Sequence, residues 1–217
     1  VLQVHAVEGP DRGLFDADAA MRWTQAWGAR TPRPFAVALP AYGVRVDTDA
    51  QGRVRAVDAE ADIERSSASG RELRADPREV AKLLRELADD RPEHLSGYLW
   101  FRLPVAGDRR GWSATALATV IAGQALQARF VVESATNAGG SLDLRVRNVG
   151  TLDARPPLID LPAHCRLGDA LGRYRLQSTK AALQLAPDPD AWLAAGERMD
   201  IGWVRCDETL EQEWMVQ

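Results

Sequence analysis

Cysteine is scarce in this chain: Cys165 and Cys206 are the only two among 217 residues. Two cysteines are too few for a disulfide-dense scaffold, and their wide separation excludes the CxxC spacing of zinc and dithiol sites. They form either one bridge or two buried thiols.

Long apolar runs and basic stripes are absent as well. No apolar run approaches the roughly 20 residues of a membrane-spanning helix, so we expect no transmembrane segment. The net charge of -4 comes from intermixed acidic and basic residues, which argues against nucleic acid as a partner. The chain carries no HExxH motif, glycine-rich phosphate loop or GxSxG elbow, so we expect no metal and no cofactor.

The first half of the sequence alternates between apolar runs and helical patterns. Three runs are typical of strands buried on both faces: VLQVHAV at residues 1–7, PFAVALPAYG at 34–43 and LSGYLWFRLP at 95–104. Because a helical pattern follows each run, we expect the strands to pair in parallel. Val1 is not an initiator methionine and already lies in an apolar run, so we expect further sequence upstream.

Capping residues mark where the three helices begin. Asp16 or Asp18 caps the first helix, and Asp76 followed by Pro77 begins the clearest one. Ser113 leads into a short third helix. The order is therefore strand then helix, three times over.

Two domains follow from this organisation. Residues 1–124 form the first, with a β-hairpin inserted at 44–57 and a polar loop at 64–72. Short strands between Gly, Pro, Asn and Asp turns predict a small antiparallel β-sandwich over 129–217. Three strand-helix units cannot close a barrel, and an open sheet would leave edges unpaired. The predicted fold class is α/β plus all-β: the last three βα units of a (β/α)8 TIM-type barrel, completed by an upstream half, then the sandwich.

A set of segments in the first half carries a family resemblance: LQVH at residues 2–5, PFAVALPAYG at 34–43, YLWFRLP at 98–104, Asp108 and Trp112. Together they resemble the domain of unknown function 3142 family (DUF3142) over residues 1–124. The resemblance implies a bacterial protein with a glycoside hydrolase-like TIM barrel, whose acidic strand-end motif would lie upstream of this chain. The segment LRVRNVG at 144–150 is loosely similar to accessory domains of envelope proteins.

Four residues near strand ends are candidates for ligand binding: His5, Tyr42, Trp100 and Arg102. Barrel enzymes place their chemistry at the carboxyl ends of the strands, which is where these residues fall. Trp100 and Arg102 share one strand face. We expect the other face, with Leu99, Phe101 and Leu103, to pack against the covering helices. An indole stacks on the apolar face of a sugar, and a guanidinium binds hydroxyls or a carboxylate.

Each candidate also has a purely structural interpretation. His5 and Gln3 would form a hydrogen-bonded core pair, and Tyr42 would serve only in packing. Arg102 would form a salt bridge with an acid of the upstream half. Asp108 lies in a loop at the same end, where a single aspartate more often caps a helix or forms a salt bridge.

The functional expectation is a protein that acts on or binds carbohydrate. Hydrolysis of a glycosidic bond usually needs two facing carboxyl groups, and no such pair ends these strands. Any catalytic carboxylates would therefore lie upstream, and whether the protein is an enzyme stays open. The alternative is a non-catalytic binding or structural protein of the cell envelope. Either way the family context predicts a periplasmic or cell-envelope location, and an approach of Cys165 to Cys206 in the sandwich.

Overall fold

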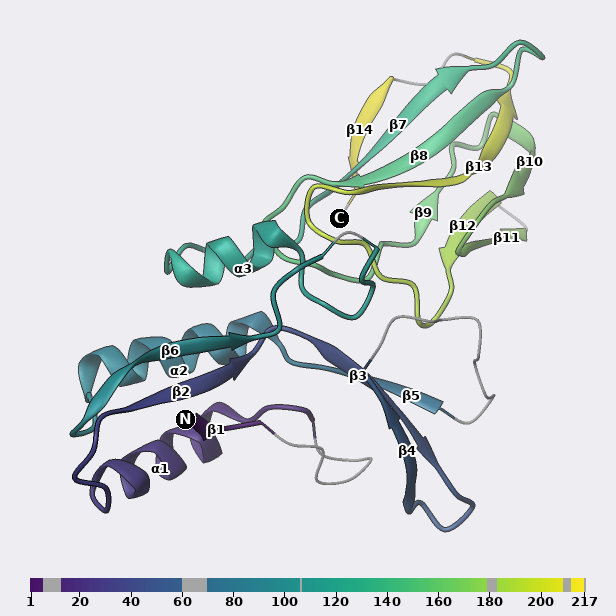
Figure 1. Cartoon of the computed structure of the whole chain (residues 1–217). Helices are drawn as coiled ribbons and strands as arrows, with labels where there is room; N and C mark the ends of the chain where they lie inside the picture. The colour runs from purple at the N-terminus through teal and green to yellow at the C-terminus, as the bar shows by residue number, and fades with distance from the viewer. Residues whose placement is uncertain (6–12, 60–69, 106, 179–182, 209–211, 217) are drawn as a thin grey trace. The chain divides into compact units, whose positions relative to one another are not determined.

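The protein divides into two compact units, residues 1–124 and residues 125–217 (Figure 1). The structure is a computed structural model, and it describes residues 1–5, 13–59, 70–105, 107–178, 183–208 and 212–216. None of the helices in these ranges is both long and apolar enough to cross a membrane.

A three-stranded parallel sheet forms the centre of the first unit. It consists of β1 (Leu2–Gln3), β2 (Phe35–Pro40) and β6 (Leu95–Phe101), in the order β1-β2-β6. Val37 and Leu39 of β2 are fully buried, which marks one face of the sheet as the core face. Trp100 pairs with Leu39 and so lies on this buried face, whereas Leu99 lies on the opposite face and is 49% exposed.

Three helices accompany this sheet, and each begins at a capping side chain. These helices are α1 (Ala17–Gly28), α2 (Pro77–Asp89) and α3 (Ala114–Ile121). The carboxylates of Asp16 and Asp76 and the hydroxyl of Ser113 accept hydrogen bonds from backbone N–H groups of the first turns. Of the two caps expected for the first helix, Asp16 is the one used.

A second small sheet follows β2 directly. It consists of β3 (Gly43–Thr48), β4 (Val54–Asp58) and β5 (Gly70–Arg74), and both neighbours of β3 are antiparallel to it. Gly43 permits this packing, because a Cβ there would lie 2.8 Å from the carbonyl oxygen of Leu73. The prediction of a polar loop at 64–72 is wrong from Gly70 onward, where β5 begins. Residues 64–69 lie outside the described ranges.

The prediction of a partial TIM-type barrel is wrong. The described residues form several small sheets with three helices and no closed barrel. After β2 the chain enters the antiparallel sheet of β3, β4 and β5 instead of continuing one curved parallel sheet. Apolar runs show that strands are buried, but closure depends on strand tilt and stagger, which periodicity does not reveal. An upstream half that completes a barrel therefore loses its basis.

Two antiparallel sheets build the second unit. The larger has the order β10-β13-β8-β7-β14 and the smaller the order β11-β12-β9. The strands are β7 (Phe130–Thr136), β8 (Leu142–Asn148), β9 (Ile159–Asp160), β10 (Cys165–Ala170), β11 (Tyr174–Ser178), β12 (Leu183–Pro187), β13 (Arg198–Cys206) and β14 (Glu213–Val216). Both sheets contribute to one hydrophobic core, which includes Leu144 and Ile201 of the larger sheet and Leu185 of the smaller.

A disulfide joins Cys165 of β10 to Cys206 of β13, which confirms the expected approach of the two cysteines. The two residues lie opposite each other in the antiparallel pairing, and the bridge closes a loop with a sequence separation of 41. Cys165 also belongs to the core of the second unit. The bridge therefore fixes the edge strand β10 to the sheet.

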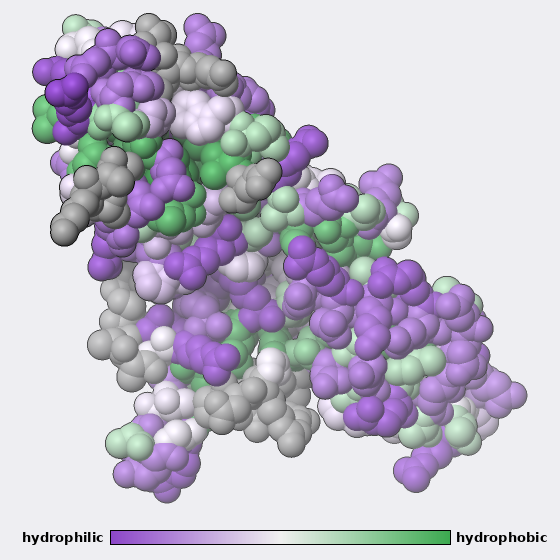
Figure 2. Space-filling view, turned by 180° about the vertical axis from the view of Figure 1, so that it is seen from behind, coloured by the Kyte–Doolittle hydropathy of each residue, from purple (hydrophilic) through white to green (hydrophobic). Residues whose placement is uncertain are grey.

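Hydrophilic residues cover most of the face seen in Figure 2, with apolar residues in separate patches between them. One exposed apolar set lies at alternating positions from the second half of β6 into the segment after it: Leu99, Phe101, Leu103 and Val105. These four residues, the β6 stripe, are large side chains that their own unit does not bury.

Removing the disulfide should destabilise the second unit. A closed loop of this length restricts the unfolded chain, and its loss is worth about 4 kcal/mol in the chain-entropy estimate. We expect the Cys165→Ala/Cys206→Ala protein to unfold at lower urea concentration than the wild type. Adding a reductant should shift the wild type toward the variant and leave the variant unchanged; a wild-type midpoint insensitive to reductant would contradict the bridge.

Core and surface leucines of the first unit should differ sharply in their effect on stability. Leu87 of α2 is fully buried, so Leu87→Ala leaves a cavity and should cost about 2–5 kcal/mol of unfolding free energy. Leu99→Ala removes a half-exposed side chain and should cost less than about 1 kcal/mol. Equal losses in urea denaturation would show that the β6 stripe is buried in the folded protein.

Candidate functional site

His5 and Tyr42 meet just beyond the carboxyl ends of β1 and β2. The two strands are parallel neighbours, so residues that follow their last paired positions emerge at the same edge of the sheet. The Tyr42 hydroxyl lies 3.2 Å from Nδ1 of His5, within hydrogen-bonding distance. The side-chain amide of Gln3 donates to the backbone carbonyl of His5 at 3.1 Å, which fixes the chain at this point.

The ring of Phe101, the last residue of β6, completes an aromatic cluster with these two side chains. Its centroid lies 5.8 Å from that of His5 in a stacked arrangement and 5.2 Å from that of Tyr42 in an edge-on arrangement. His5 and Tyr42 are both buried, but Phe101 is 52% exposed. The cluster therefore presents one aromatic ring to solvent above two buried polar rings.

An ion pair borders this cluster. The guanidinium of Arg102 contacts the carboxylate of Asp108 with 2.5 Å between Nη2 and Oδ2. The other carboxylate oxygen, Oδ1, accepts hydrogen bonds from the backbone N–H groups of Arg110 and Gly111 at 2.9 and 3.0 Å. The Asp108 side chain is 4% exposed and that of Arg102 is 27% exposed. Arg102 is therefore the member of the pair that solvent reaches.

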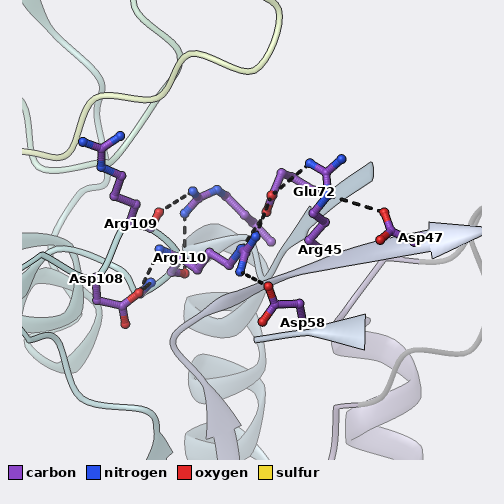
Figure 3. Close-up of polar contacts among 9 residues, drawn as sticks. Arg45, Asp47, Asp58, Glu72, Asp108, Arg109 and Arg110 are labelled. Atoms are coloured by element: carbon purple, nitrogen blue, oxygen red, sulfur yellow. Dashed lines mark hydrogen bonds and ion pairs between the residues drawn. The ribbon is translucent and has the colours of Figure 1, made fainter. Parts of the chain in front are cut away.

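A buried arginine holds the loop that carries Asp108. Arg110 is 2% exposed, and its guanidinium contacts Glu72 of β5 and Asp58 of β4 (Figure 3). The guanidinium of Arg74 reaches back to the backbone carbonyl of Arg109 at 2.5 Å. Charged side chains of the antiparallel sheet and of the loop after β6 thus link these two segments.

The electrostatic environment keeps the aromatic pair uncharged and the aspartate charged. Burial lowers the pKa of His5 below its ordinary value. Burial also raises the pKa of Tyr42, although the nearby charge of Arg102 opposes that rise. For Asp108, burial opposes ionisation, but the N–H groups of its loop and Arg102 outweigh it and lower the pKa of the carboxyl. At neutral pH the site holds one ion pair and no excess charge from these groups.

One polar atom beneath the exposed ring has no partner. Nε2 of His5 is buried and forms no hydrogen bond within the described residues. A buried polar atom left unpaired costs about 1–3 kcal/mol, so such atoms are uncommon away from ligand or water sites. The imidazole that carries this atom is stacked on Phe101, the half-exposed ring of the cluster.

The structure separates the four predicted site residues into two groups. His5 and Tyr42 lie together, and Arg102 is close enough for its charge to act on the Tyr42 hydroxyl. Trp100 is elsewhere: its ring lies 6.2 Å from that of Trp112, on the buried face of the sheet. The expectation that the side chains between Trp100 and Arg102 cover the helix side is wrong, because Phe101 is exposed.

The sequence analysis missed Phe101 and the pairing of Arg102 with Asp108. Phe101 carried a usable signal, since it lies in the third apolar run between Trp100 and Arg102, two of the candidate residues. The expected structural alternative for Arg102, a salt bridge, has its acid six residues further along the same chain. The alternative for Asp108 also holds, because it pairs with Arg102 and accepts bonds from its own loop.

A second group of chemically reactive side chains lies in the second unit. Ligand atoms of His164, Cys165 and Cys206 lie within 4.8 Å of one another. Both sulfur atoms take part in the disulfide, so they cannot act as thiolate ligands in this state. This group therefore has one imidazole to offer a metal ion.

Comparison with known proteins finds, for each unit, one family model that matches part of it. Residues 1–106 match the model of a family described as domain of unknown function DUF3142, which confirms that resemblance over this range. Residues 131–207 match a second model, domain of unknown function DUF8456. No curated protein and no solved structure matches the chain significantly. The expected likeness to glycoside hydrolase-like barrels gains no support from these comparisons.

Stability should depend on pH through His5. Because burial lowers its pKa in the folded protein, the unfolded chain takes up the proton first as the pH falls. The stability that neutral His5 confers is complete above its ordinary pKa of about 6.5 and is lost as the pH falls below that value. We expect the unfolding free energy from urea denaturation to decrease more steeply from about pH 7.5 to about pH 5.5 in the wild type than in His5→Gln.

Tyr42→Phe is the matched variant for this measurement. It removes the hydroxyl that contacts Nδ1 but retains the titrating imidazole, so the steep pH dependence should persist at a lower overall stability. Equal pH slopes for the wild type and His5→Gln would rule out a buried neutral histidine.

Proposed function

We propose that this chain is part of an exported cell-envelope protein whose first unit binds a glycan at the edge formed by Phe101 and Arg102. The observation that carries the proposal is the half-exposed ring of Phe101, stacked on buried His5 beside the ion pair of Arg102. An aromatic platform next to groups that hydrogen-bond hydroxyls is the combination that sugar recognition needs.

Phe101 supplies the apolar half of this recognition. The C–H groups on one face of a pyranose ring pack on an aromatic face, and stacking of this kind adds about 0.5–1.5 kcal/mol beyond the area that it buries. The contacts with His5 and Tyr42 limit the movement of the phenyl ring. A platform held in place before binding loses less conformational entropy when a ligand arrives.

Arg102 supplies the polar half. Its guanidinium carries five donors, and Asp108 occupies one side of it through Nη2. Nε of Arg102 is buried, so the N–H groups of Nη1 and Nη2 that do not face Asp108 are the donors for sugar hydroxyls, and the fixed carboxylate holds the guanidinium in one orientation. His5 and Tyr42 act beneath this surface as positioning residues, because neither is exposed enough to form a large part of it.

The chemistry of the site favours binding over hydrolysis. Among the described residues, Asp108 is the carboxyl group that pairs with Arg102 at this edge, and its lowered pKa and engaged oxygens make it a poor proton donor at neutral pH. The proposal therefore assigns no reaction to these residues.

The disulfide supports the location in the envelope. Structural disulfides form and persist in oxidising compartments such as the periplasm and the cell exterior, and are rare in the cytosol. The Cys165–Cys206 bridge joins two strands of a core sheet, which is a structural arrangement. The proposed location follows from the formation of this bridge in the cell.

The β6 stripe favours a second candidate, a surface that packs against another protein. Its four apolar side chains extend past Phe101 to Leu103 and Val105, which are still more exposed, and contiguous exposed apolar surface is typical of protein interfaces. On this candidate, Leu99, Leu103 and Val105 would matter as much as Phe101. That difference separates the two functions by experiment.

Phe101→Ala should weaken glycan binding, and Leu99→Ala should leave it unchanged. Both side chains lie on the same exposed face of β6 with nearly equal exposure, but Phe101 alone has the aromatic contacts. We expect isothermal titration calorimetry of the wild type with cellohexaose, xylohexaose, chitohexaose and maltohexaose to show binding of at least one. For that sugar, Phe101→Ala should weaken binding by a factor of about ten, which corresponds to about 1.4 kcal/mol.

Size-exclusion chromatography with light scattering tests the second candidate on the same proteins. A wild type that binds none of the four sugars and self-associates, with association lost in both Phe101→Ala and Leu99→Ala, would replace the glycan proposal by a protein interface. Equal loss of sugar binding in both variants would also count against a platform at Phe101.

A further inference from the structure

We propose that Asp108 makes this site selective for uncharged sugars, by neutralising the only guanidinium that borders the aromatic cluster among the described contacts. The inference rests on the proposed glycan site and adds the class of glycan. Its basis is the geometry of the Arg102–Asp108 pair.

The guanidinium groups of Arg102 and Arg110 are already paired with carboxylates. Arg102 is matched by Asp108, and the neighbouring Arg110 is matched by Asp58 and Glu72 on its far side. The side chain of Arg109 points away from Asp108 (Figure 3). A ligand at Phe101 therefore meets an arginine whose positive charge is already compensated at 2.5 Å.

This pairing treats neutral and acidic sugars differently. A hydroxyl needs only a hydrogen bond, which the N–H groups of Nη1 and Nη2 that do not face Asp108 supply without disturbing that residue. A uronate carboxylate must lose its hydration and then compete with Asp108 for the same guanidinium, while the charge of Asp108 repels it. Selectivity of this kind comes from a repulsive group built into the site as well as from an attractive one.

Asp108 is held firmly enough to keep that role when a ligand binds. Its side chain is almost completely buried, and two backbone N–H groups of its own loop bind Oδ1. The loop is in turn fixed by Arg110 between two acidic residues of the antiparallel sheet. An anionic ligand cannot displace Asp108 simply by rotating an exposed side chain.

Asp108→Asn tests the charge with little change of shape. The amide oxygen of asparagine can still accept from the N–H groups of Arg110 and Gly111, while the negative charge beside Arg102 disappears. We expect wild-type protein to bind the neutral hexasaccharide found in the panel at least ten times more tightly than hexagalacturonate. In Asp108→Asn the affinity for hexagalacturonate should rise at least tenfold, and it should fall again as salt is added.

Asp18→Asn is the control for net charge. It removes one negative charge from an exposed position of α1 that pairs with Lys82 and not with Arg102, so hexagalacturonate affinity should stay as in the wild type. Circular dichroism and thermal unfolding of each variant verify the fold. If Asp108→Asn does not fold, Arg102→Gln gives the complementary test: it removes the cation beside Asp108, so hexagalacturonate should bind less tightly than to the wild type.

The possible results distinguish a failure of the selectivity from a failure of the glycan site itself. Wild-type protein that binds hexagalacturonate as tightly as neutral hexasaccharides overturns the selectivity but keeps the glycan site. An unchanged hexagalacturonate affinity in folded Asp108→Asn overturns it as well, as does an equal gain in Asp18→Asn. Wild-type protein that binds neither neutral nor acidic glycans removes the site itself, and the selectivity with it.

Discussion

The burial of one guanidinium, that of Arg110, sets the arrangement on which the first unit depends. A charge removed from water must be met by opposite charge, or the loss of hydration is not compensated. Arg110 therefore requires Asp58 and Glu72, and these come from β4 and β5 of the antiparallel sheet. The same residue carries one of the N–H groups that orient Asp108. Asp108 in turn pairs with Arg102, so the position of Arg102 depends on the buried arginine through Asp108.

Local structure was largely readable from the sequence, because its signals are local. The aspartate and proline before α2 and the apolar run of β2 each act within a few residues. The strand β5 escaped notice because its residues are mainly polar and it owes its pairing to β3. The barrel failed for a related reason: the curvature and closure of a sheet depend on neighbours and stagger, which no single apolar run specifies.

The site shows how far strand periodicity can be taken. Alternation correctly placed Trp100 opposite in direction to Leu99 and Phe101, but it does not say which set faces the core. Both sets of β6 are apolar and aromatic, so their composition was ambiguous. The register with β2 decides it, since Trp100 pairs with fully buried Leu39. The exposed aromatic residue is therefore Phe101, the immediate neighbour of Trp100, which was expected to bind the ligand.

The disulfide of the second unit has a consequence for a protein pulled from its ends. Tension applied along the chain passes through the Cys165–Cys206 bond and bypasses the segment between the two sulfur atoms. With a separation of 41 residues, on the order of 140 Å of contour length stays locked even after the surrounding sheet has ruptured. The oxidised unit is thus a short tether under load, and reduction would turn it into a long one.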